Sequence, residues 1–142
     1  MALLPIYNGV AVAGVFLSGR RQVLLEWFPI CYHDAMKVVE YLDSAGRSPF
    51  ADWFEELDAV AAAKVTVSLA RMEAGNLSNV KTVGSGVLEY RIDFGPGYRV
   101  YFGREGDRLV ILLAGGTKQR QQKDISTAHA RWEDYKRRKK EG

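Results

Sequence analysis

The chain has few of the residues that disulfide-bonded and zinc-binding domains need. Its 142 residues include one cysteine, Cys31, and two histidines, His33 and His129. A single cysteine excludes a disulfide framework, and these three residues are too few for a zinc site of the usual Cys/His kind. No apolar run approaches the roughly 20 residues that cross a bilayer. We therefore expect a protein that does not span a membrane and, because nothing marks it for export, one that is cytoplasmic.

The composition is that of one globular domain with an uneven distribution of charge. Hydrophobic residues make up 47% and charged residues 26%, which excludes a disordered chain. The net charge is +3, yet residues 36–75 carry four basic and seven acidic side chains, whereas residues 76–142 carry 14 basic and eight acidic. A one-sided basic surface attracts phosphate, so the second half suggests a polyanionic partner. Basic halves also occur on proteins that bind nothing charged.

Residues 1–35 differ in pattern from the remainder of the chain. Small apolar residues run from Val10 to Leu17 without a helical or alternating period. A signal peptide would place its positive charges before such a stretch, but Arg20 and Arg21 follow it, which argues against export. We expect residues 1–35 to be an N-terminal appendage, either from a mis-assigned start codon or poorly ordered, and residues 36–142 to be the functional domain. The alternative is an additional strand that packs on the sheet.

The first half of the domain predicts a strand followed by two helices. A short apolar run over residues 38–41 is typical of a strand. Ser48 is a suitable N-cap, with Pro49 at the first helical position, and apolar residues then recur at helical spacing. A second helix is expected over residues 59–74, ending at Gly75-Asn76. The short link between the two helices predicts a helical hairpin.

The second half predicts a meander of strands and a polar helix. The strands are expected over residues 87–94, 98–103 and 108–114. Gly95-Pro96-Gly97 and Gly115-Gly116 are interpreted as turns with positive φ rather than as phosphate-binding loops. A C-terminal helix is expected over residues 118–140. The predicted order β-α-α-β-β-β-α indicates an α+β fold, with an antiparallel sheet and with the hairpin and C-terminal helix packed on one face.

Alternation along the strands places several charged residues on one side of this sheet. Arg91 and Asp93 face away from their apolar neighbours, and Arg99 and Tyr101 do the same on the following strand. We expect this side to be open, with Lys118 close to it. Such a cluster of cations and a phenol is suited to binding RNA phosphates and to stabilising charge that develops on a phosphoryl group.

The alternative interpretation gives these residues no chemical role. They would then be solvated surface residues, with Arg91 paired to Asp93 or Glu89. Periodicity alone does not separate the two interpretations.

Three segments of the chain together resemble a known toxin superfamily. They are MKVVEYLDSAGRSPFADWFEEL, YRIDFGPGYRVYF and ILLAGGTKQRQQKDISTAHARWEDYKRR, between Met36 and about Arg138. Each motif alone is weak, but the combination resembles the RelE/ParE toxins of toxin–antitoxin modules, and most closely the phage-derived, HigB-like addiction module killer branch. The resemblance implies a RelE-like fold.

The resemblance also implies an activity. Such toxins of type II toxin–antitoxin systems enter the ribosome and cut translated mRNA, using no metal or other cofactor, by attack of the RNA 2′-hydroxyl on the adjacent phosphate. Arg99 matches the strand arginine that contacts the scissile phosphate, and Arg91 matches a basic position that holds the RNA backbone. Lys118 falls where relatives place a residue thought to protonate the leaving oxygen. Tyr101 lies beside them by strand parity.

Three positions depart from the pattern of the family. Asp93 stands where some relatives have a second basic residue, and Asp124 stands where some have an aromatic one. His129 lies further along the helix than a catalytic histidine would, so we expect a surface or helix-packing role for it. Lysine and arginine are poor acid–base catalysts near pH 7 unless their pKa is shifted. A mechanism based on positioning and electrostatics is therefore expected.

The resemblance further implies partners. The cognate partner would be a small helix-turn-helix antitoxin, and the substrate would be mRNA on the ribosome. Arg120, Lys123, Arg137 and Arg138 are candidates for phosphate contacts, although the last basic run is equally typical of a solvated helix end. Similar folds also poison DNA gyrase without cutting RNA. A gyrase-binding toxin and an inactive relative that regulates its antitoxin are therefore the alternatives.

Overall fold

The computed structural model describes residues 35–142, and the expectations for residues 1–34 lie outside this range. The helices and strands follow one another along the chain as β1 (Lys37–Glu40), α3 (Pro49–Glu55), α4 (Ala59–Glu73), β2 (Val80–Thr82), β3 (Val87–Ile92), β4 (Tyr98–Glu105), β5 (Leu109–Thr117), the 3-10 turn η2 (Lys118–Arg120) and α5 (Gln121–Glu141). The predicted α+β class is confirmed.

The sheet has the strand order β1-β5-β4-β3-β2. Strand β1 runs parallel to β5, whereas the other neighbours are antiparallel. The expectation of a purely antiparallel sheet was therefore wrong, and β2 was missed. Three residues, VKT, are too short to show an alternating pattern, and β2 is defined only by its pairing, in which Val80 lies opposite Tyr90.

Both hairpin helices begin at capping side chains. The hydroxyl of Ser48 accepts a hydrogen bond from the backbone N–H of Ala51 at 3.0 Å, as expected for the N-cap of α3. The carboxylate of Asp58 accepts one from Ala61 at 2.9 Å and begins α4. These caps satisfy N–H groups that the first helical turn leaves free.

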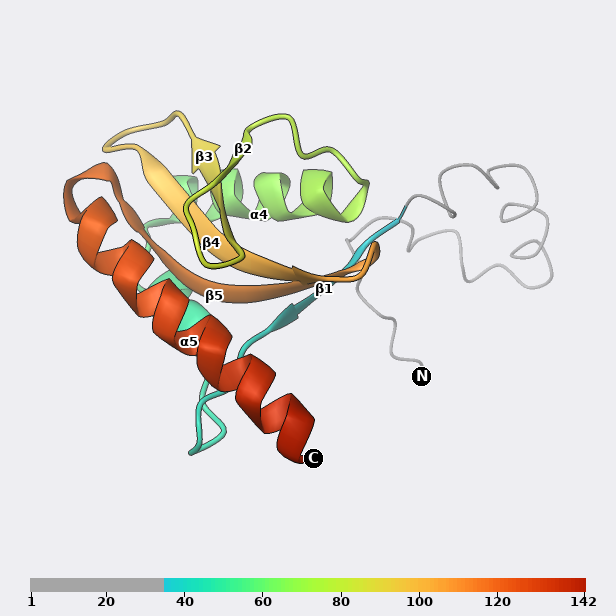
Figure 1. The fold of residues 1–142 in the computed structure, drawn as a ribbon. Helices are drawn as coiled ribbons and strands as arrows, with labels where there is room; N and C mark the ends of the chain where they lie inside the picture. Colours follow the sequence, from blue (N-terminus) through green and yellow to red (C-terminus); the bar gives the residue numbers. More distant parts are fainter. Residues whose placement is uncertain (1–34) are drawn as a thin grey trace, which may run out of the picture.

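Helices cover both faces of the sheet, so the expectation that they share one face was wrong. Figure 1 shows α4 behind the sheet and α5 across its front. One core contains Phe50 and Val65 from the hairpin, and the other contains Tyr101, Ala128 and Trp132 on the side of α5.

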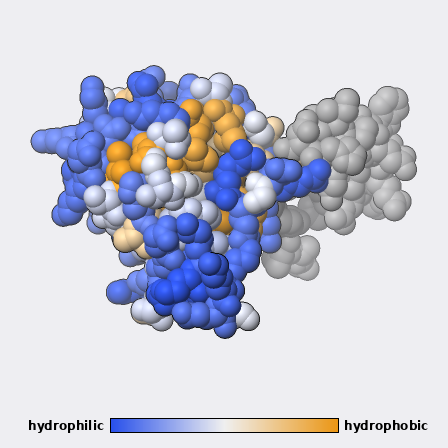
Figure 2. Space-filling view, in the orientation of Figure 1, coloured by the Kyte–Doolittle hydropathy of each residue, from blue (hydrophilic) through white to orange (hydrophobic). Residues whose placement is uncertain are grey.

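The hydrophobic pattern of α5 does not predict that this helix packs on the sheet. Its buried residues are Asp124, Ala128 and Trp132, one in every four. This stripe is too narrow to stand out in a polar helix, and the surface of α5 that faces the solvent is hydrophilic (Figure 2).

The two glycine pairs behave differently. Gly95 and Gly97 have positive φ values of 55° and 83°, as expected for their turn. Gly115 and Gly116 instead continue β5 as strand residues, so the turn expected there was wrong. A side chain at Gly115 would overlap the ring of Trp53. Their role is therefore to permit close packing rather than to turn the chain.

Candidate functional site

Three of the predicted site residues lie at one end of the sheet. The register places Arg91 of β3 opposite Arg99 of β4, and Arg99 opposite Gly116 of β5. The backbone N–H of Lys118 donates to the carbonyl of Gly97 at 2.9 Å, which fixes the start of η2 beside the β3–β4 turn. We call Arg91, Arg99 and Lys118 the cation cluster.

The members of the cation cluster differ in exposure. Arg91 is exposed and lies 3.7 Å from the carboxylate of Asp93, and Lys118 is exposed. Arg99 is only 7% exposed and Tyr101 is fully buried, because α5 covers this side of the sheet. The expectation of an open face was therefore wrong for both of these residues.

Arg99 is held by a backbone carbonyl and by a buried carboxylate. Its Nη1 donates to the carbonyl of Gly97 at 2.9 Å, and its Nε lies 3.7 Å from Oε2 of Glu89. Glu89 is fully buried, accepts a hydrogen bond from Gln121 at 2.7 Å and has Lys81 at 3.5 Å. An ionised carboxylate is tolerated in the interior when it has such partners.

Glu89 was expected only as a surface ion-pair partner of Arg91, yet it is fully buried. One feature of the sequence could have identified Glu89. It is a charged residue between two apolar residues of an interior strand, and alternation places it on the same side of the sheet as Arg91. Its position beneath Gln121 depends on how α5 packs, which alternation along a strand does not show.

Two further ionisable groups are buried beside this cluster. Burial raises the pKa of the Tyr101 phenol above its usual range, and the negative charges of Glu89 and Asp124 raise it further. Burial also raises the pKa of Asp124, an effect that Arg120 and Lys123 oppose. Asp124 is 9% exposed, and its Oδ2 has no hydrogen-bond partner among the described residues.

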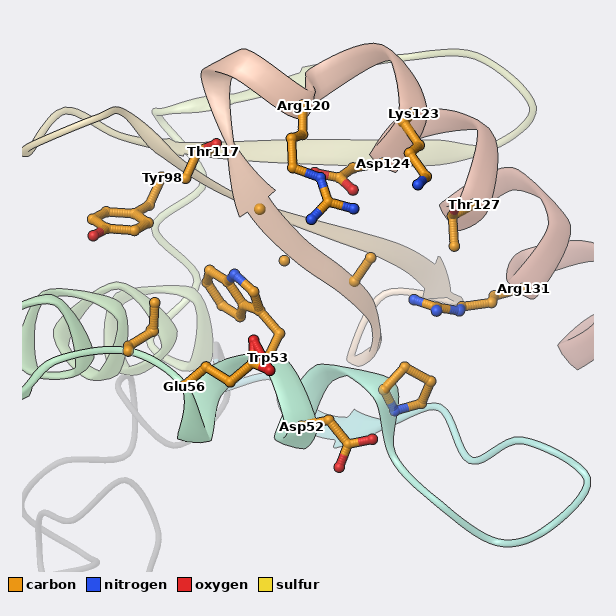
Figure 3. A pocket seen from close by; sticks show the side chains of 15 residues that line it. Asp52, Trp53, Glu56, Tyr98, Thr117, Arg120, Lys123, Asp124, Thr127 and Arg131 are labelled. Atoms are coloured by element: carbon orange, nitrogen blue, oxygen red, sulfur yellow. The ribbon is translucent and has the colours of Figure 1, made fainter.

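A cleft of about 560 Å³ is lined by Tyr98 and Thr117, the residues that precede Arg99 and Lys118 in the chain. It lies between α3 and α5, at the end of β5 that extends beyond β1. Figure 3 shows Trp53 on the side of α3 and Arg120 and Arg131 extending toward the cleft from the side of α5. Arg120 and Lys123 are exposed, and Arg131 donates to the carbonyl of Leu113 at 2.8 Å.

Arg137 and Arg138 do not line this cleft. The last residue of α5 that lines it is Arg131, and Arg137 and Arg138 follow six and seven residues later, which is roughly 10 Å of helix at about 1.5 Å per residue. Arg137 forms ion pairs with Asp134 and Glu141, while Arg138 bonds to Asp134 and to the carbonyl of Leu42. The four predicted RNA-binding residues therefore form two groups, of which only Arg120 and Lys123 are next to the site.

His129 has the packing role that its position predicted. Its Nε2 lies 3.0 Å from the carbonyl of Val83, in contact with the loop that precedes β3. Among residues 35–142, no group of three or more His, Cys, Asp and Glu side chains is arranged to hold a metal ion. No helix in the described part of the chain is long and apolar enough to span a membrane.

The arrangement of the helices and the sheet is consistent with a RelE-like α+β fold, and comparison with known proteins identifies the family. Residues 52–133 match a family model described as phage derived protein Gp49-like (DUF891). An "Uncharacterized protein" of Haemophilus influenzae (strain ATCC 51907 / DSM 11121 / KW20 / Rd) is 44% identical over 80 residues, which cover 56% of this chain and 81% of that protein. The chain therefore belongs to the Gp49-like family of phage-derived proteins, within the RelE/Gp49 toxins.

Proposed function

We propose that the chain is the toxin of a type II toxin–antitoxin pair, of the HigB-like branch, and that it cuts mRNA on translating ribosomes. The observation that carries the proposal is the cation cluster, in which Arg91, Arg99 and Lys118 come from three chain segments to one end of the sheet. Arginine and lysine are the side chains that bind phosphate most readily. The family supports a toxin, and the cluster supports a polyanionic substrate.

The proposed reaction is an internal phosphoryl transfer. The 2′-oxygen of one ribose forms a bond to the adjacent phosphorus and loses its proton to water, and the bond from phosphorus to the 5′-oxygen breaks. The products are a 2′,3′-cyclic phosphate and a 5′-hydroxyl. Negative charge grows on the phosphoryl oxygens in the transition state, where Arg91 and Arg99 would stabilise it. The ammonium group of Lys118 would give a proton to the leaving oxygen.

The anchoring of Arg99 favours a mechanism based on positioning. Its guanidinium group is held by the carbonyl of Gly97 and by Glu89. A fixed cation needs little reorganisation when charge develops beside it, and this makes its stabilisation more effective than that of a mobile one. Tyr101 is fully buried and lies beneath this arrangement, so we assign it a positioning role rather than contact with RNA.

The proposal includes partners. Arg120 and Lys123 would bind the RNA backbone next to the scissile phosphate, since both are exposed on the side of the cation cluster. A helix-turn-helix antitoxin would neutralise the toxin, and the pair would act in the cytoplasm, where translating ribosomes are found.

The test is cleavage mapping in a reconstituted translation reaction with the full chain. Wild-type protein should cut within codons only while ribosomes translate, and Arg99→Ala should abolish the cuts. Arg104→Ala is the control, because Arg104 is an exposed arginine on the same strand, and its side chain donates to the carbonyl of Asp107 in a turn. Circular dichroism melting of both variants separates a lost phosphate contact from a lost fold.

Intact mRNA in the presence of wild-type protein that stops growth in cells would contradict the proposal. DNA damage responses in the same cells would then indicate the gyrase-binding alternative. A protein that neither cuts mRNA nor stops growth would be the inactive relative.

A further inference from the structure

We propose that Gln121 is a positioning residue of the site, which holds Arg99 and Lys118 in a fixed arrangement relative to each other. The inference rests on the proposed function, because it gives a further residue a role in the same reaction. Arg99 and Lys118 would act on one phosphate group, so displacement of one relative to the other should slow cleavage. Gln121 is the first residue of α5 and directly follows the turn η2, which begins at Lys118.

One backbone carbonyl connects Arg99 to Lys118. The carbonyl of Gly97 accepts a hydrogen bond from the backbone N–H of Lys118 at 2.9 Å and another from Nη1 of Arg99 at 2.9 Å. A β-carbon at Gly97 would lie 3.1 Å from Nη1 of Arg99 and 3.4 Å from the β-carbon of Lys118. The three residues are therefore closely packed. A single hydrogen bond to Nη1, however, still allows the guanidinium group to pivot about this carbonyl.

A second connection between Arg99 and Lys118 runs through Gln121. The side-chain amide of Gln121 donates to Oε2 of Glu89 at 2.7 Å, and Nε of Arg99 lies 3.7 Å from the same oxygen. The backbone N–H of Gln121 donates to the carbonyl of Lys118. Gln121 therefore closes a cycle of contacts that passes through Lys118, Gly97, Arg99 and Glu89.

Gln121 orients the carboxylate of Glu89, and through it the guanidinium group of Arg99. Glu89 is fully buried, and its Oε1 has no hydrogen-bond partner in the described part of the chain. Lys81 lies 3.5 Å from Oε1, but its side chain is 54% exposed to solvent. A short hydrogen bond to a charged acceptor is strong and directional, so the contact from Gln121 restricts rotation of the carboxylate most. Oε2 then attracts Nε of Arg99 from a fixed position.

The test compares Gln121→Met with Gln122→Met in the full chain. Methionine retains the length and helix propensity of glutamine but cannot donate a hydrogen bond. The matched control is Gln122, the exposed neighbour on the same helix. In single-turnover cleavage on translating ribosomes, Gln121→Met should lower the rate at saturating protein by about tenfold to a hundredfold, the effect of a small displacement of a catalytic group.

The same assay separates positioning from binding of RNA. The protein concentration that gives half the maximal rate should change by less than about twofold in Gln121→Met, because every side chain proposed to bind phosphate remains. Gln122→Met should behave as wild type. Gln121→Met combined with Glu89→Gln should cut no more slowly than Glu89→Gln alone, since both changes break the same connection to Arg99.

A spectroscopic measurement tests the placement of Arg99 without any activity. The Nε–H signal of Arg99 in the nuclear magnetic resonance spectrum, assigned with Arg99→Lys, should move in Gln121→Met and stay in place in Gln122→Met. Circular dichroism melting shows whether each variant is folded at the temperature of the assays.

The inference is wrong if the Arg99 signal does not move in Gln121→Met, or if this variant cuts mRNA at the wild-type rate. Additive losses in the double variant would show that Gln121 acts independently of Glu89 and would also overturn it. An unfolded Gln121→Met would give the residue a structural role in place of a positioning one. Wild-type protein that cuts no mRNA refutes the endonuclease, whereas the Arg99 signal still decides whether Gln121 holds the guanidinium group.

Discussion

Replacing Gly103 with alanine should destabilise the protein, and the size of the effect tests whether α5 packs where the structure places it. Gly103 lies on β4 and its φ is not positive, so alanine is compatible with the backbone. Without a steric conflict, the change would stabilise the protein by about 0.4–1 kcal/mol, because it restricts the unfolded chain. A β-carbon here, however, would lie 2.5 Å from two ring atoms of Trp132 and 2.7 Å from a third.

The ring of Trp132 has little room to move away. Its partner Tyr135 is stacked on it with a centroid distance of 5.3 Å, and Trp132 itself is 6% exposed. Carbon atoms in contact are normally about 3.5–4.0 Å apart, so the helix or the strand must shift by roughly 1 Å. Overpacking of this kind costs about 1–3 kcal/mol. We expect a net loss of about 2 kcal/mol from the free energy of unfolding.

The assay is urea unfolding, monitored by far-ultraviolet circular dichroism. Tryptophan fluorescence is unsuitable because the control variant described next lacks Trp132. In a Trp132→Leu background the conflict is absent, and Gly103→Ala should become neutral or mildly stabilising. An equal effect of Gly103→Ala in both backgrounds would refute the reasoning, and with it the placement of α5 across this face.

Two other substitutions test the site and the hairpin. Burial raises the pKa of the Asp124 carboxyl group, so the folded protein binds the carboxyl proton more tightly than the unfolded chain does. The free energy of unfolding should therefore fall as pH rises through the raised pKa. Asp124→Asn should therefore raise the melting temperature at neutral pH and reduce the loss of stability that begins, as pH rises, near the ordinary aspartate pKa of about 4. Thermal melts from acid to neutral pH measure this, and an unchanged pH profile would contradict it. Ser48→Ala removes the cap of α3 and should cost about 1 kcal/mol in chemical denaturation, whereas Ser48→Asp should retain most of the stability.

The parts of the fold that could be predicted are those that local chemistry determines. A capping serine followed by proline defines the start of α3, and long alternating or apolar runs define β3, β4 and β5. Strand β2 depends on pairing with Tyr90 and its neighbours, and the parallel alignment of β1 with β5 depends on the arrangement of distant segments. Neither is contained in a local pattern.

Parity predicted which site residues share a face, but not whether that face is covered. Arg91 and Arg99 are directly opposite each other on neighbouring strands, as one shared side requires. The assumption that polar residues mark the solvent side was wrong, because α5 brings Trp132 and Ala128 onto the same face. The interior on that side is mixed, with Glu89 and Arg99 among apolar residues, and alternation cannot separate a mixed interior from a surface.

This mixed interior determines how loss-of-function variants of the toxin should be interpreted. An exposed cation such as Lys118 can be removed with little effect on the fold, so lost activity reports on lost contact with RNA. Removal of Arg99 also takes one of two cations from a fully buried Glu89 and leaves only Lys81 beside it, and a buried carboxylate that loses part of its compensation destabilises the fold. Arg99→Ala combined with Glu89→Gln removes both charges together. If this double variant retains the fold but does not cut mRNA, the activity is lost because the guanidinium group of Arg99 is missing, and not because the carboxylate of Glu89 has lost a partner.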